Sequence, residues 1–104
     1  MSATVIFTQL CEQSGLPKPQ PEYMFHKTRK WRIDYFFEKG AKKLALEVEG
    51  GVWKNGRHNR AAGFLKDMEK YNALTLHGIY LLRVTPNDLL KINTINMIST
   101  FFEN

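Results

Sequence analysis

The hydrophobic and polar positions along the chain change period several times, and each change marks the end of an expected element. Residues 4–14 carry apolar side chains at helical spacing and are followed by Gly15, so a helix is expected there. The three prolines of "LPKPQPE" then predict a rigid connector, because proline lacks a backbone donor and forces the preceding residue to be extended.

Three strands are expected next, at residues 23–28, 30–37 and 43–49. The alternation of apolar and polar residues in the second and third predicts that each buries one face. The apolar positions expected on those faces are Trp31, Ile33, Tyr35 and Phe37 in the second strand, and Leu44, Leu46 and Val48 in the third.

The remainder of the chain predicts a helix, a strand and a helix. The period is helical over residues 59–77 and stops at Gly78, and "IYLLRV" is typical of a largely buried strand that ends before Pro86. Asn87 or Asp88 is expected to cap a last helix. The order predicts one α/β domain over residues 1–104, a mixed four-stranded sheet with flanking helices.

The helix expected at residues 59–77 has an apolar arc that we expect to face the sheet. At one border of this arc lie basic side chains that would reach a carboxylate or a phosphate, although a solvated flank with an Asp67–Lys70 ion pair explains them equally well. The arc comprises Phe64, Leu65, Met68, Asn72, Thr75 and Leu76, and the border comprises Arg60, Gly63, Asp67 and Lys70.

A two-residue loop at Gly40 and Ala41 would fix the register between the second and third strands, since glycine at the first loop position is the type II′ pattern. In that register the numbers of two paired residues add to 81, the sum for the loop residues 40 and 41. Asp34 then lies opposite Glu47, and Arg32 lies opposite Glu49. Period two places all three acids on one face. Like charges directly opposite each other are destabilising, so a cation is required there.

That cation is Arg32, a basic side chain from elsewhere, or a divalent metal. Carboxylate ligands on a rigid sheet suit Mg²⁺ or Mn²⁺ better than zinc. The simpler alternative is a solvated face whose acids pair with Arg32 and Lys43.

Composition narrows the classes of protein further. The chain has 104 residues, 43% of them hydrophobic, with a formal net charge of +5, which suits a polyanionic partner, although many small basic proteins bind none. Cys11 is the only cysteine, which excludes an internal disulfide and a multi-cysteine zinc site. No secretion signal and no apolar run of ~20 residues is seen, so we expect a cytoplasmic protein with no membrane partner.

The ordered pattern of "EYMFHKTRKWRIDYFF", "KLALEVEGGVW", "GRHNRAAGFLKDMEKYN" and "GIYLLRVTP" resembles the PD-(D/E)XK, or restriction-endonuclease-like, superfamily, and in particular its small phage and prophage nuclease-like proteins. The resemblance covers roughly residues 20 to 86. It implies a restriction-endonuclease-like core of αβββαβ order plus a C-terminal helix, with Mg²⁺ on Asp34 and Glu47 and Mn²⁺ able to substitute. For a phage-derived protein, the location would be the cytoplasm of a bacterial host.

The chain departs from that family at the motif lysine, which is Glu49 here. Either Glu49 is a third metal ligand while Lys66 or Lys70 supplies the positive charge from the following helix, or the chemistry is lost. The resemblance also offers Glu22 as an accessory acid. Asp67 is a second accessory candidate.

The leading hypothesis is a Mg²⁺-dependent endonuclease that hydrolyses phosphodiester bonds, with DNA as the expected substrate. Lys70, Arg57 and Arg60 would stabilise charge on the phosphate. The alternatives are a catalytically inactive DNA-binding protein on the same fold, an RNA nuclease, and a structural protein whose acids form surface ion pairs. A domain this small would need a second copy, as a homodimer, to cut both strands of a duplex. The nucleic-acid contacts are expected from Lys54, Arg57, His58 and Arg60.

Overall fold

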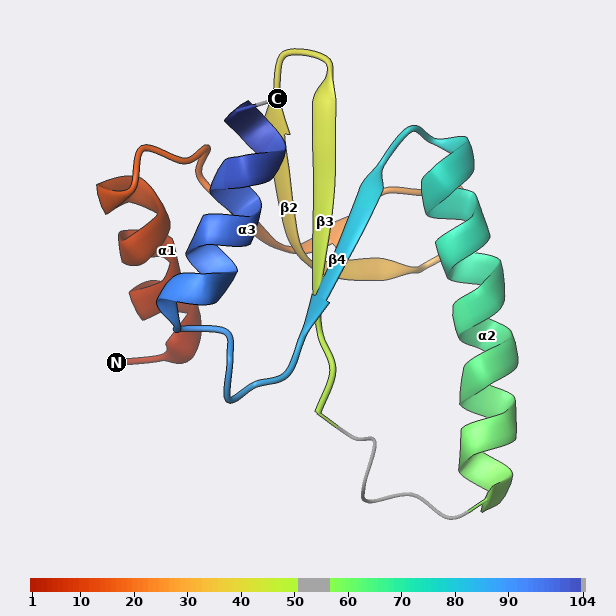
Figure 1. Ribbon diagram of the computed structural model, residues 1–104. Helices are drawn as coiled ribbons and strands as arrows, with labels where there is room; N and C mark the ends of the chain where they lie inside the picture. The colour runs from red at the N-terminus through yellow and green to blue at the C-terminus, as the bar shows by residue number, and fades with distance from the viewer. Residues whose placement is uncertain (51–56, 104) are drawn as a thin grey trace.

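The computed structural model describes residues 1–50 and 57–103 (Figure 1). It is an α/β fold in the expected order of helix, three strands, helix, strand and helix. The elements are α1 (Ala3–Gln13), β1 (Gln20–Met24), β2 (Arg32–Lys39), β3 (Lys42–Val48), α2 (Arg57–Leu76), β4 (Tyr80–Val84) and α3 (Ile92–Glu103).

The four strands form one mixed sheet in the order β1-β2-β3-β4. The first two pairings are antiparallel and the β3–β4 pairing is parallel, because α2 carries the chain back between β3 and β4. The predicted mixed four-stranded sheet is therefore confirmed.

Helices cover both faces of the sheet. Helices α1 and α3 lie on one face and α2 on the other (Figure 1). The α1 and α3 side buries the larger core, in which Phe7 and Ile98 pack against Phe37 and Leu46. The α2 side buries a smaller core, which comprises Ile33, Phe36, Ala45, Leu74 and Ile79.

The hairpin between β2 and β3 has the predicted two-residue loop. Tyr35 pairs with Leu46 and Lys39 pairs with Lys42, which is the predicted register, leaving Gly40 and Ala41 as the loop. Gly40 has a φ of 61°, the left-handed value that type II′ requires at its first loop position.

The first strand and the last helix begin at positions other than those predicted. β1 starts at Gln20 rather than at residue 23 and includes Pro21, which an edge strand tolerates. α3 starts at Ile92 rather than after Asn87 or Asp88. The intervening residues form a turn, in which the Asp88 N–H donates to the Thr85 carbonyl and the Thr94 hydroxyl donates to the Asp88 carbonyl.

The strict alternation predicted for β2 is wrong at its start. Ile33 belongs to the core on the α2 side, whereas Tyr35 and Phe37 belong to the core on the α1 and α3 side. Figure 1 shows β2 bending near this end of the strand. The change of face falls between Ile33 and Tyr35, so Asp34, one of the three acids, lies where it occurs.

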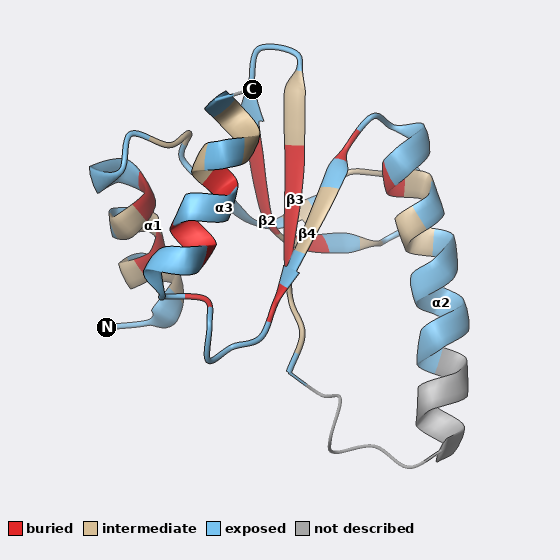
Figure 2. Ribbon diagram, in the orientation of Figure 1, coloured by how far each residue is buried: buried red, intermediate tan, exposed pale blue. Residues whose placement is uncertain are grey.

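The predicted orientation of α2 is also wrong. Phe64, Leu65, Met68 and Leu76 are exposed, with 67% of Phe64 and 86% of Leu76 accessible to solvent. The side chains that approach the sheet instead come from the last two turns, where Leu74 is buried. Figure 2 shows the remaining described surface of α2 as largely exposed.

Two glycine substitutions are expected to change stability in opposite directions. Gly40→Ala should lower the free energy of unfolding by about 1–2 kcal/mol, because an L side chain is strained at a left-handed φ. Gly63→Ala should raise it by roughly 0.5–1 kcal/mol, because Gly63 is exposed within α2 and an added Cβ would meet no atom within 4 Å. Urea denaturation of both variants measures these changes, and a Gly40→Ala variant as stable as the wild type would contradict the hairpin geometry.

Candidate functional site

The candidate site lies at the C-terminal end of β3, where that strand carries Glu47 and Glu49. Glu47 is flanked by β2 on one side and by β4 on the other, where it pairs with Arg83. Only 8% of the Glu47 side chain is exposed, which makes it one of two buried polar or charged residues in the described chain. Buried carboxylates are rare without a partner, so its surroundings decide what it can do.

Asp34 lies beside Glu47, as the hairpin register predicts. Its Oδ2 accepts a hydrogen bond of 2.7 Å from the Val48 backbone N–H. Side-chain hydrogen bonding and like charge from Asp34 both raise the pKa of Glu47, so the two carboxyl groups are in direct contact. Two acids of different strands therefore meet at the point where the buried face of β2 changes.

Lys70 supplies the cation that this pair requires. It extends from α2 so that its Nζ lies 2.5 Å from Glu47 Oε1, and only 16% of its side chain is exposed. Lys66 lies one turn earlier and is exposed. Of the two lysines considered from the sequence, Lys70 is therefore the one that the fold brings to the acids.

Burial raises the pKa of Glu47 to about 7, although the hydrogen bond and charge of Lys70 act to lower it. The like charge of Asp34 adds to the effect of burial. A carboxyl group that titrates near neutral pH can lose its proton to bind a metal ion, and it can also give a proton to a reacting group or take one from it.

Glu49 is bound by different partners. Arg83 donates to both of its oxygens, with Nε at 2.7 Å from Oε1 and an amino nitrogen at 3.1 Å from Oε2, and the Tyr71 hydroxyl donates to Oε1 at 3.0 Å. Partial burial opposes ionisation, but these hydrogen bonds and the charges of Arg83 and Lys70 hold the pKa of Glu49 below its usual value. The same contacts raise the pKa of Tyr71, through burial and the bond to Glu49, and the pKa of Arg83.

The prediction that Arg32 lies across from Glu49 is wrong. Arg32 contacts Glu22 instead, at 3.3 Å between its guanidinium and Oε2. Lys43 lies opposite Glu38, near the hairpin loop. The cations that neutralise the acids therefore come from α2 and β4, and the alternative of pairing with Arg32 and Lys43 does not hold.

Glu22 stands next to the site but has a separate partner. It has a φ of 53°, a left-handed value that is costly for glutamate, and it borders a cavity of about 300 Å³ together with Asp34 and Val48. Its carboxylate is bonded to Arg32. Asp67 is exposed on α2, and its charge contributes to raising the pKa values of Tyr71 and Arg83.

Four of the expected nucleic-acid contacts cannot be placed. Lys54 lies outside the described residues. Arg57, His58 and Arg60 have a described helical backbone, but their side chains are outside the described set. α2 begins at Arg57, two residues before the start of the helix predicted over residues 59–77.

Arg83 and Tyr71 are the two site residues that sequence reasoning missed. Arg83 is a single charge within the apolar run "IYLLRV", which is a signal that it has a polar partner. Only the parallel pairing of β4 with β3 shows that this partner is an acid of β3. Tyr71 directly follows Lys70 and gave no comparable signal.

The oxygen donors of Asp34 and Glu47 suit a hard cation such as Mg²⁺, which binds through one or two carboxylates and otherwise through water and phosphate. Among the side chains that the structure describes, no group of three or more histidine, cysteine or acidic residues is arranged to hold a metal. Glu49 does not join the pair, because both of its oxygens are bonded to Arg83. The arrangement is thus a two-carboxylate site with an adjacent lysine.

No protein-family model, curated protein or solved structure matches the chain. None of the helices in the described residues has both the length and the apolar character needed to cross a membrane.

The raised pKa of Glu47 predicts how stability depends on pH. In EDTA, the free energy of unfolding should fall by up to about 3 kcal/mol as the pH rises from about 4.5 to about 7, because the folded protein retains a proton that the unfolded chain releases. Glu47→Gln should remove most of this dependence. Urea denaturation at a series of pH values measures it, and an unchanged profile in Glu47→Gln would show that another group is responsible.

Asp34→Asn is expected to raise stability at pH 8 without metal by roughly 1 kcal/mol, because it removes a like charge beside Glu47 and keeps an acceptor for the Val48 N–H. Asp34→Ala is the matched control and should be less stable than Asp34→Asn, since it leaves that N–H without its acceptor. A strong loss of stability in Asp34→Asn would mean that the charge of Asp34 is itself required by the fold.

Proposed function

We propose that the protein is a Mg²⁺-dependent endonuclease with a restriction-endonuclease-like core. The observation that supports this most directly is the contact of Lys70 with the buried Asp34–Glu47 pair. Two carboxylates and a lysine, brought together from three elements, form the chemical set that phosphodiester hydrolysis requires. The αβββαβ order of the chain agrees with the expected core.

Asp34 and Glu47 are the proposed metal ligands. A Mg²⁺ ion held there would lower the pKa of a bound water and neutralise charge on the phosphate. Binding requires that Glu47 be ionised, so its affinity should increase as the pH rises through about 7. Mn²⁺, with similar ligand preferences, is expected to substitute.

Lys70 takes the role of the motif lysine that Glu49 replaces. In the free protein it balances the charge of Glu47, and with substrate present its ammonium group would contact the scissile phosphate, where negative charge develops. Arg83 adds a second cation from the neighbouring strand β4, held in a fixed orientation by its two bonds to Glu49. The chain thus provides two cations from positions other than the one used in the family pattern.

The binding of Glu49 supports one alternative function. That alternative is a catalytically inactive nucleic-acid-binding protein. Glu49 is bonded to Arg83 and Tyr71 and is not free to activate water, and a non-catalytic protein would not need a lysine in its place. DNA remains the expected substrate and RNA the alternative. Cutting both strands of a duplex would require a second copy of the chain.

Cleavage assays with matched lysine variants test the proposal. Supercoiled, linear, branched and single-stranded DNA and RNA would be incubated with Mg²⁺, Mn²⁺ or EDTA. Lys70→Ala should reduce the cleavage rate by roughly 10²- to 10³-fold. Lys66→Ala, the exposed control one turn away on α2, should leave the rate within about twofold of the wild type, because surface substitutions rarely alter a distant site.

Glu47→Ala should abolish metal-dependent cleavage while leaving salt-sensitive nucleic-acid binding in place. If the wild type binds nucleic acid but cuts no substrate with either metal, the binding-protein alternative is correct. Equal losses in Lys66→Ala and Lys70→Ala would show that Lys70 has no special part in the reaction.

A further inference from the structure

A cavity of about 360 Å³ opens beside the candidate site, between the end of β4 and the start of α3. It is close to the lower end of the usual size range of ligand sites, which is roughly 300–1,000 Å³. Three separate segments form it: the end of β3, the end of β4 with the following turn, and the first turns of α3. The residues that matter for its chemistry are Arg83, Thr85, Asp88, Lys91, Asn93 and Met97, with Glu49 at its edge.

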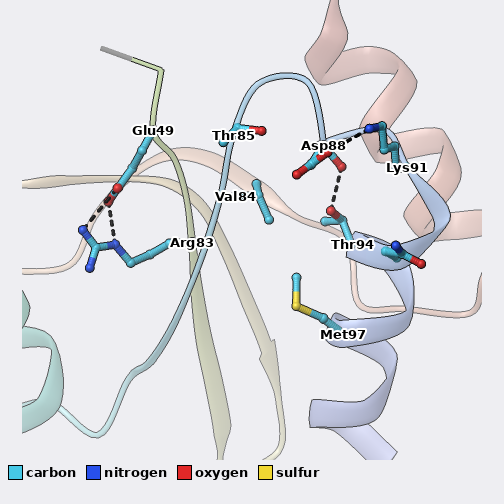
Figure 3. Close-up of a pocket in the computed structure, with 9 residues that line it drawn as sticks. Glu49, Arg83, Val84, Thr85, Asp88, Lys91, Thr94 and Met97 are labelled. Carbon is cyan, nitrogen blue, oxygen red and sulfur yellow. Dashed lines mark hydrogen bonds and ion pairs between the residues drawn. The ribbon is translucent and has the colours of Figure 1, made fainter. Parts of the chain in front are cut away.

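Two ion pairs stand on opposite sides of this cavity (Figure 3). One joins Arg83 to Glu49 at 2.7 Å, and the other joins Lys91 Nζ to Asp88 Oδ1 at 3.0 Å. Each positive charge is matched by a negative one, so the cavity as a whole is close to neutral. A small neutral group with hydrogen-bond donors and acceptors is therefore a better match for its interior than a bare phosphate.

The interior between the two pairs is apolar. Val84, only 8% exposed, and Met97, 40% exposed, lie there, as Figure 3 shows. A thioether packs well against the face or edge of a flat aromatic ring. Around this apolar floor, the Asn93 amide and the Thr85 hydroxyl can both donate and accept hydrogen bonds. A flat ring with polar edges fits this combination, and a nucleobase has that character.

The cavity lies near the acids, past the end of β3. Glu49 borders it and follows Glu47 by two residues of extended chain, a spacing of about 6.6 Å. Glu47 and Lys70 meet on the α2 face, whereas Thr94 and Met97 line the cavity from α3 on the other face. A nucleic-acid strand whose phosphate lies at Glu47 and Lys70 would therefore pass over the ends of β3 and β4 to bring its neighbouring nucleotide to the cavity.

From these observations we infer that the cavity between β4 and α3 binds the base of an unpaired nucleotide next to the phosphodiester bond that is cut. The role in cleavage rests on the proposed function, whereas the binding of the base does not. A base within a duplex is stacked and paired and cannot enter a pocket without being extruded. The preferred substrates are therefore those with unpaired nucleotides at the cut: single strands, flaps, bulges and loops.

Arg83 and Lys91 hold the flanking phosphates in this arrangement. Both cations are at least half exposed, at 52% and 62% of their side chains, and exposed ion pairs open at little cost in free energy. Lys91 can therefore turn from Asp88 toward a phosphate of the strand, while Arg83 stays on Glu49 and presents its remaining N–H groups, and the base occupies the apolar floor. This explains why the cavity has cations at its rim and none at its centre.

Binding of single nucleotides tests the inference without any cleavage. ¹⁵N-labelled protein, with EDTA present, would be titrated with 5′-AMP or 5′-CMP and separately with ribose 5-phosphate. The nucleotides should shift the backbone amide signals of Arg83, Thr85 and Asn93, and ribose 5-phosphate should bind roughly tenfold more weakly, because it lacks the base. Equal binding of ribose 5-phosphate would show that the cavity recognises phosphate and would overturn the inference.

Two variants and one control locate the binding. Met97→Trp should fill the cavity and weaken nucleotide binding by about tenfold, a loss typical of removing one stacked base. Asn93→Ala, a small change near the start of α3, should weaken binding without disturbing the core. Ile92→Trp is the control, since Ile92 is 66% exposed and does not border the cavity, and it should bind as the wild type does. Unchanged binding in both Met97→Trp and Asn93→Ala would overturn the inference.

The failure of this inference can be distinguished from failure of the proposed function. Metal-dependent cleavage at equal rates on single-stranded and duplex DNA, unaffected by Met97→Trp, would overturn the base pocket and leave the nuclease in place. Nucleotide binding at the cavity without cleavage of any substrate would overturn the nuclease and leave the base pocket. Preferential cleavage at unpaired nucleotides that Met97→Trp removes would support both.

Discussion

The contact of buried Glu47 with Lys70 determines much of what surrounds it. A carboxylate with 8% of its side chain exposed is tolerated only if a cation or a proton balances its charge, and Asp34 beside it makes that need greater. Lys70 satisfies the need from α2, which packs on the face of the sheet that Glu47 occupies. That contact, together with the burial of Leu74 one turn later, fixes the rotation of α2 about its own axis.

The same constraint explains which parts of the fold the sequence predicts and which it does not. The β2–β3 hairpin is predicted correctly, down to its register, because a two-residue loop with Gly40 is a local signal. The rotation of α2 is predicted wrongly, because its apolar arc of Phe64, Leu65 and Met68 is a stronger pattern in the sequence than one lysine. A long-range ion pair outweighs the local pattern here. β1 is likewise misplaced, since its proline, Pro21, is acceptable only on an edge strand, and edge position is a property of the whole sheet.

The residues of the candidate site also fall into those that the sequence predicts and those that it does not. Asp34 and Glu47 are found from the sequence, because both lie on one hairpin and the loop relates them. Arg83 and Tyr71 are not found, because they lie on β4 and α2, and their relation to Glu49 depends on a parallel pairing made through a crossover helix. Local geometry therefore gives the acids and offers Lys70 as one of two candidate lysines, whereas only the assembled fold selects Lys70 and adds Arg83.

Glu49 can then be understood through charge. Glu49 adds a third negative charge at the end of β3. The fold compensates with Arg83 on the neighbouring strand, and the two bonds that join them also fix the guanidinium in place. Lys70 and Arg83 together supply the balancing positive charge from two directions, Lys70 from α2 and Arg83 from β4. Part of that positive charge therefore lies toward β4 and the cavity beside it.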